Sequence, residues 1–212
     1  MRAMNDARPA RLSIDYPDRA LNRLTSALRF FTVIPIAIVL ATVGGYSATV
    51  TNGASTSTVA VGGTGLLFLP PLLMILFRQR YPRWWFDWNQ ELLRFATRVG
   101  AYLALMDDRY PSTEDHQSVH LDLDYPDAKN ELNRWLPLVK WLLAIPHFIA
   151  LFFLYVGVFF VVIAAWFSIL FTGRYPRGMF DFVEGVIRWQ LRVAAYALIL
   201  ITDSYPPFSL RP

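Results

Sequence analysis

Apolar and polar positions in this chain separate into long blocks instead of alternating evenly. The longest block, residues 141–173, contains no Asp, Glu, Lys or Arg and a single His. As one helix it would be about 50 Å long, well beyond the roughly 30 Å hydrocarbon core of a bilayer. Folded at Gly157, it becomes two spans that fit a bilayer with little tilt. The block therefore predicts a transmembrane hairpin, with spans at about residues 137–155 and 157–172.

The first half of the chain predicts a second, less regular hairpin. Residues 27–43 form an apolar run after an Arg-rich start, which resembles a signal peptide. The long polar tail and the lack of an A-x-A site favour an uncleaved first span. Residues 44–65 are uncharged and rich in Gly, Ser and Thr, which is typical of a flexible or weakly β-forming loop. The next span is predicted at about 59–77, with Pro70 and Pro71 bending or starting its helix.

Two segments have the period of an amphipathic helix, residues 86–106 and 180–201. At about 100° per residue, the charged positions of the first segment fall on one stripe, opposite Leu and Val. Between the halves, residues 119–125 alternate apolar and polar side chains, which predicts a β-strand.

The chain also repeats itself. LSIDYPD at residues 12–18 matches LDLDYPD at 121–127, and RYPR occurs at both 80–83 and 174–177. The pattern predicts an all-α integral membrane protein of two pseudo-symmetric repeats. Each repeat has a short β-strand, a transmembrane helical hairpin and an amphipathic interfacial helix, which makes four spans in total. The predicted boundaries are an N-terminal tail at 1–11, repeat 1 at 12–111, a linker at 112–120 and repeat 2 at 121–207.

The topology depends on whether the amphipathic helices cross the membrane. If they do, each repeat has three spans and the repeats are inverted. If they lie in the interface, the repeats are parallel and all twenty Lys and Arg residues face the cytoplasm. Placing Arg at mid-membrane costs about 2.5–3.5 kcal/mol for each residue. The parallel arrangement is therefore preferred, with both termini on the cytoplasmic side of a bacterial plasma membrane.

Composition agrees with a membrane protein. The chain is 55% hydrophobic and 17% charged, whereas soluble domains are about a quarter charged. The absence of Cys excludes disulfides, zinc-thiolate sites and thiol catalysis. The net charge of +4 is typical of a membrane protein whose Lys and Arg face the cytoplasm. No basic cluster of the chain predicts a nucleic-acid partner.

Residues 145–210 resemble a bacterial membrane family called domain of unknown function 4389. The resemblance lies in Pro146-His147, the Gly-Arg-Tyr-Pro corner at 173–176, the Arg-bearing helix at 188–192 and the Tyr-Pro-Pro-Phe end at 205–208. The first half resembles the family more loosely, which suggests two tandem copies. The family has no assigned activity, so the resemblance implies a fold and a location and no mechanism.

The basic stripes are the main candidate site. They are predicted to contact lipid headgroups or another phosphate ligand, with Arg at the corners contributing. The residues are Arg80, Arg83, Arg94, Arg98, Arg174, Arg177, Arg188 and Arg192. The alternative is that these arginines only form the solvent-exposed polar face of an interfacial helix, where nearby Glu side chains pair with them.

Other candidates carry less chemistry. His147 lies inside a span and is expected to be neutral and bonded to a neighbouring helix or subunit. His116 and His120 have nearby carboxylates, which would suffice for a loose cation site, but a solvated strand face is preferred. No catalytic residue, cofactor or metal is predicted.

The resulting hypothesis is a non-catalytic membrane protein, an accessory or scaffold subunit of a larger membrane assembly. Its predicted partners are membrane lipids and other membrane subunits or further copies of itself. An anionic-lipid-binding protein and a small transporter using the repeat interface are the alternatives.

Overall fold

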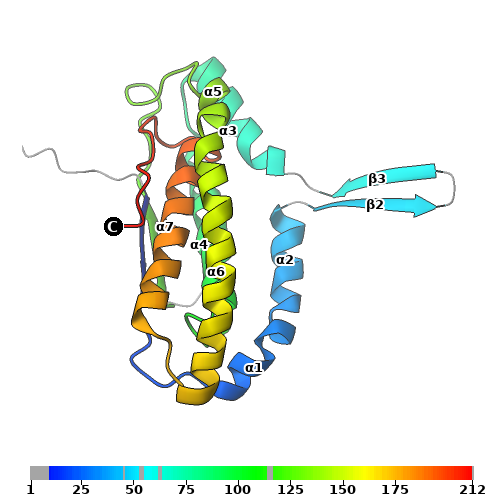
Figure 1. The fold of residues 1–212 in the computed structure, drawn as a ribbon. Coiled ribbons are helices and arrows are strands. Elements are labelled where there is room, and N and C mark those ends of the chain that lie inside the picture. The colour runs from blue at the N-terminus through cyan, green and yellow to red at the C-terminus, as the bar shows by residue number, and fades with distance from the viewer. Residues whose placement is uncertain (1–9, 45, 53–54, 62–63, 114–116, 212) are drawn as a thin grey trace, which may run out of the picture.

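The computed structural model describes residues 10–44, 46–52, 55–61, 64–113 and 117–211 (Figure 1). The described chain is mostly helical, as predicted. Its elements in order are β1 (Ala10–Ile14), α1 (Arg23–Thr32), α2 (Ile34–Gly44), β2 (Tyr46–Asn52), β3 (Ser55–Val61), α3 (Thr64–Arg78), α4 (Arg83–Leu103), β4 (Val119–Leu123), α5 (Pro137–Leu143), α6 (Ile145–Thr172) and α7 (Arg177–Ala197).

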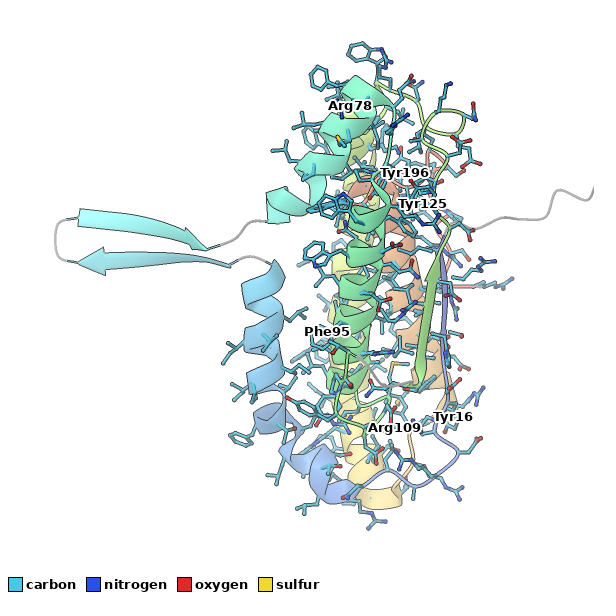
Figure 2. All side chains as sticks on the ribbon, turned by 180° about the vertical axis from the view of Figure 1, so that it is seen from behind. Tyr16, Arg78, Phe95, Arg109, Tyr125 and Tyr196 are labelled. Atoms are coloured by element: carbon cyan, nitrogen blue, oxygen red, sulfur yellow. The ribbon has the colours of Figure 1, made fainter. Side chains whose placement is uncertain are left out.

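Strands β1 and β4, over a hundred residues apart, form a two-stranded antiparallel sheet in which Leu12 lies opposite Leu121. Both strands alternate buried and exposed residues, so one face of the sheet packs on α4 and α7. Helix α6 packs along α7, and α2 contacts α4. In Figures 1 and 2, the sheet and α2 lie on opposite sides of the α4–α7 layer. The charged helices therefore form a middle layer between a sheet and the apolar helices.

The predicted turn at Gly157 is wrong. Residues 145–172 form one continuous helix, and a separate short helix, α5, precedes it. Gly157 lies inside this helix, and a Cβ there would lie 3.5 Å from the Phe182 ring of α7, an ordinary contact distance. A lone Gly costs a helix only about 1 kcal/mol, so it can lie inside a continuous helix without marking a turn. The break that does occur lies between α5 and α6, at Ala144, just before Pro146.

The first half does not form the predicted spans either. Helices α1 and α2 meet at a bend of 52°. The segment predicted as a flexible or weakly β-forming loop contains the β2–β3 hairpin. Residues 59–61 belong to β3, so α3 starts at Thr64 and is 15 residues long, too short for a span. Within the described residues, α6 is the single unbent helix long and apolar enough to cross a membrane; four spans are not found.

The two amphipathic helices are present, each starting about three residues before the predicted position. Pro82 and Pro176 lie at the N-caps of α4 and α7. After each helix the chain turns through a Leu in the left-handed region, Leu105 at φ 65° and Leu200 at φ 63°. A residue with positive φ after the last helical turn redirects the chain and ends the helix.

The two outer surfaces have opposite character. On the sheet, the outward residues include Arg11, His120 and Asp122, all exposed. On the other side, α6 exposes a row of large apolar side chains: Phe148, Phe152, Phe153, Phe159, Phe160, Phe167 and Phe171. The molecule is therefore charged on one broad face and apolar on the other.

Candidate functional site

The Arg stripes bind the chain's own backbone. Arg94 on α4 donates from Nη2 to the Leu121 carbonyl of β4 at 2.9 Å. Arg188 on α7 donates from Nε to the Leu12 carbonyl of β1 at 3.2 Å. Each guanidinium also pairs with a Glu on its own helix. The two Arg side chains thus attach the sheet to the helices beneath it.

The next Arg on each helix holds the segment that follows that helix. Arg98 donates to the Ser112 carbonyl at 2.5 Å, and Arg192 donates to the Arg211 carbonyl at 2.9 Å. Both side chains are buried. The four stripe arginines, which were predicted to contact headgroups, form internal hydrogen bonds instead. They hold the sheet and the segments that follow α4 and α7.

The corner residues differ from the stripes because they are exposed. The Arg83 guanidinium lies over the Tyr125 ring and that of Arg177 over the Tyr16 ring, at 5.2 and 4.4 Å from the ring centroids. The same two tyrosine hydroxyls donate to corner carbonyls in the opposite half, those of residues 81 and 175. Burial raises the pKa of the Tyr81 hydroxyl, which donates to a carbonyl after α7. Arg80 and Arg174 are exposed and have no ion pair within the described chain.

Two buried cations are not among the residues that the sequence pattern predicts for the site. Lys140 of α5 is fully buried, with Nζ 2.7 Å from Asp203 Oδ1 and 2.6 Å from the Thr202 carbonyl. Burial lowers the pKa of Lys140, and Asp203 opposes this shift. Arg29 of α1 is 3% exposed and lies over the Tyr102 ring at 4.4 Å. The signal was available, because each cation follows a matching Leu-Asn-Arg segment by six residues.

His147 lies in a packed aromatic cluster. Its Nδ1 accepts a hydrogen bond from Trp189 Nε1 of α7 at 3.1 Å. The imidazole stacks on the Phe208 ring, with centroids 4.0 Å apart, and contacts Tyr205. This contact joins α6 to α7 and to the C-terminal segment.

No group of three metal-ligating side chains is found among the described residues. His120 lies 3.0 Å from Asp15 on the exposed face of the sheet. His116 of the alternative cation site lies outside the described residues.

One family model matches the chain. Residues 135–209 match the family described as Domain of unknown function (DUF4389). The match supports the resemblance in the second half, but it is a single copy, so the prediction of two tandem copies is not supported. Comparison with curated proteins and with solved structures finds no match.

Proposed function

We propose that the protein is a non-catalytic membrane module, an accessory or scaffold subunit. In this proposal its apolar helices lie in one lipid leaflet and its sheet faces the cytoplasm. The carrying observation is the exposed row of Phe side chains along α6, opposite the charged face of the sheet. An apolar patch of this extent on a monomer marks a membrane or protein contact.

A flat orientation fits this layering better than an upright one. Helix α6 is about 42 Å long, and α7 packs along it with the sheet attached behind. If α6 stood upright, the exposed side chains of Arg11, Asp122 and Asp124 would lie at membrane depth. Each charged group there costs about 2.5–3.5 kcal/mol unless another protein covers it. Lying flat, the molecule leaves these groups in water.

We further propose that the two halves descend from one duplicated unit. Support comes from equivalent contacts: the amide N–H of Asn22 donates to Asp108 and that of Asn133 to Asp203. The Arg94 and Arg188 contacts with opposite strands are a second such pair. On this view α2 and α3 together correspond to α6, and the β2–β3 hairpin is an insertion near the middle of that helix.

The insertion can be tested by deletion. Helices α2 and α3 have 11 and 15 residues, so two alanines in place of residues 45–63 would give one helix with the 28 residues of α6. We expect the deleted protein to retain its helical circular dichroism and its thermal stability. Loss of folding would count against the insertion.

The orientation can be tested by spin-label depth measurements in vesicles. The chain has no Cys, so single Cys substitutions label one site each. Ile145, Phe152 and Phe159 are seven residues apart on one exposed face of α6. A flat helix gives equal depths at the three sites, whereas an upright helix gives depths that change by about 10 Å per step. A label at exposed Ser13 of β1 is the aqueous control, and unequal depths along α6 would refute the flat orientation.

The scaffold role has its own test. Purification in a mild detergent should recover a membrane protein at fixed stoichiometry. Substituting Phe159 and Phe160 by Ala should reduce that recovery if the row contacts the partner. A protein that remains monomeric and alone in every mild extraction would contradict the role.

A second candidate function is contact with anionic headgroups through the corners. It is favoured by the exposure of Arg80 and Arg174, which follow exposed Phe77 and Phe171 by three residues along the chain. Arg80→Gln with Arg174→Gln should weaken binding to vesicles containing phosphatidylglycerol. Arg11→Gln on the sheet is the matched control, and equal loss in both would show a non-specific charge effect.

A further inference from the structure

A groove of about 400 Å³ opens between α1 and α6, and Leu103 and Leu105 at the end of α4 also line it. Its apolar wall on α6 is formed by Val162, Ile163, Trp166 and Phe167. Its floor on α1 contains Ser26 and Arg29, which are 1% and 3% exposed. The groove therefore combines an apolar channel with a buried positive charge.

Arg29 is only partly satisfied by the protein. Its Nη1 donates to the Tyr102 carbonyl at 2.9 Å, but Nε and Nη2 have no hydrogen-bond partner within the described chain. The Ser26 hydroxyl, also in the floor, is likewise buried without a partner. Leaving a buried donor unpaired costs about 1–3 kcal/mol, and more when the group is charged. Nε and Nη2 form one edge of the guanidinium, the edge that binds a carboxylate through two parallel hydrogen bonds.

The other half of the molecule shows what this position looks like when it is satisfied. Lys140, at the position matching Arg29, has its carboxylate partner in Asp203. The residue matching Asp203 is Asp108, which instead pairs with Arg19 and accepts from the Asn22 amide. Asp107 is held by the Ser118 hydroxyl at 2.6 Å. The internal acid that would complete the Arg29 site is thus already engaged.

Arg29 forms no ion pair within the described chain, whereas Asp107 and Asp108 lie against Arg19. The unpaired charge at the groove is therefore positive, and a ligand with a negative head group balances it. The groove volume is in the range of pockets that bury small ligands, roughly 300–1,000 Å³.

We propose that this groove binds a single-chain amphiphile with a carboxylate head, a long-chain fatty acid. The carboxylate accepts from Nε and Nη2 of Arg29 and from the Ser26 hydroxyl, which are buried in the empty groove and turn towards the ligand when it binds. The acyl chain lies along the α6 wall, against Ile163 and Trp166. The site goes beyond the scaffold role, and it does not depend on how the molecule is oriented in the membrane.

The experiment is native mass spectrometry of the whole protein from a neutral detergent, titrated with stearate. Stearyl alcohol tests the head group, and lysophosphatidate tests the phosphate alternative. We expect a saturable one-to-one adduct with stearate and weaker adducts with the other two. Equal binding of the alcohol would overturn the role of Arg29, and preferred binding of lysophosphatidate would overturn the carboxylate assignment.

Variants of the protein test the residues. Arg29→Gln should weaken stearate binding about tenfold or more, because it removes the charged edge. Arg23→Gln is the matched control, as Arg23 is an exposed cation on the same helix. Ile163→Trp narrows the groove at a partly exposed position and should also reduce stearate binding, which keeps the proposal testable if Arg29→Gln fails to fold. Unchanged stearate binding in folded Arg29→Gln or in Ile163→Trp would refute the site.

Discussion

The ion pair between Lys140 and Asp203 allows a quantitative test of the buried-cation interpretation. Asp203→Asn removes the charge that faces a fully buried ammonium. Lys140 would keep the Thr202 carbonyl and the Tyr196 ring, whose centroid is 5.2 Å from Nζ. Breaking a buried pair by removing one partner costs about 3–5 kcal/mol. Because the Asp203 side chain is 22% exposed, water can reach part of the site, and we expect a loss of about 3 kcal/mol.

The reverse substitution should cost less. Lys140→Met removes the buried charge and keeps an apolar side chain of similar length. Asp203 would still accept from the Asn133 amide at 2.6 Å and would remain partly hydrated. We expect a loss of about 1–2 kcal/mol. The double variant should lose less than the sum of the two, with a coupling free energy of about 2 kcal/mol.

The assay is equilibrium unfolding of the four proteins in mixed micelles, followed by circular dichroism. A parallel cycle at Arg29 and Asp108, the matching positions, is the control. We expect little coupling there, because Asp108 pairs with Arg19. Additive losses at Lys140 and Asp203, or equal coupling in the two cycles, would refute the assignment of the carboxylate to Lys140.

Four further predictions concern other parts of the fold. Burial lowers the pKa of Lys140 in the folded protein below its usual 10.5, so between these two pKa values the unfolded state binds more protons. The free energy of unfolding, relative to that of Lys140→Met, should therefore rise with pH towards 10.5. A difference that does not change with pH would contradict the lowered pKa. Gly157→Ala should leave stability unchanged or raise it by up to about 1 kcal/mol, because the added Cβ lies at an ordinary contact distance from a neighbouring ring within a continuous helix. Thermal unfolding measures this change. A large loss of stability would favour the predicted turn at Gly157. Gln79 and Gly173 occupy matching corners with left-handed backbone, at φ 48° and 74°. In the same assay Gln79→Gly should stabilise the protein and Gly173→Ala should destabilise it, each by about 1 kcal/mol. A change of the same sign in both variants would be inconsistent with left-handed backbone strain. Arg188→Ala should destabilise by about 1.5–3 kcal/mol and speed amide exchange in β1, whereas exposed Arg174→Ala should do neither.

Much of the local structure was present in the sequence pattern. The alternation at 119–125 and the 100° periodicity of the two Arg-bearing segments predicted β4, α4 and α7 because both depend on residues a few positions apart. The uncharged block predicted an apolar helix for the same reason. The predicted turn at Gly157 is wrong because span length was assumed to limit the helix, whereas residues 145–172 continue through the glycine as one helix.

The candidate site was predicted less well. The pattern identified which arginines share a face, but it could not say what that face contacts. Arg94 and Arg188 bind carbonyls in strands 27 and 176 residues away along the chain. The repeat marks Arg29 and Lys140 as matching cations, but the carbonyl and ring that Arg29 contacts belong to Tyr102, 73 residues away along the chain.

The sequence by itself determined the periodic elements, the apolar blocks and the matching motifs in the two halves, all of which follow from short-range spacing. Only the tertiary structure decided that each strand packs on the Arg-bearing helix of the other half. It alone also decided that Lys140 has its acid while Arg29 does not. Those outcomes depend on contacts between segments far apart in sequence, where small differences in packing decide which charge meets which partner.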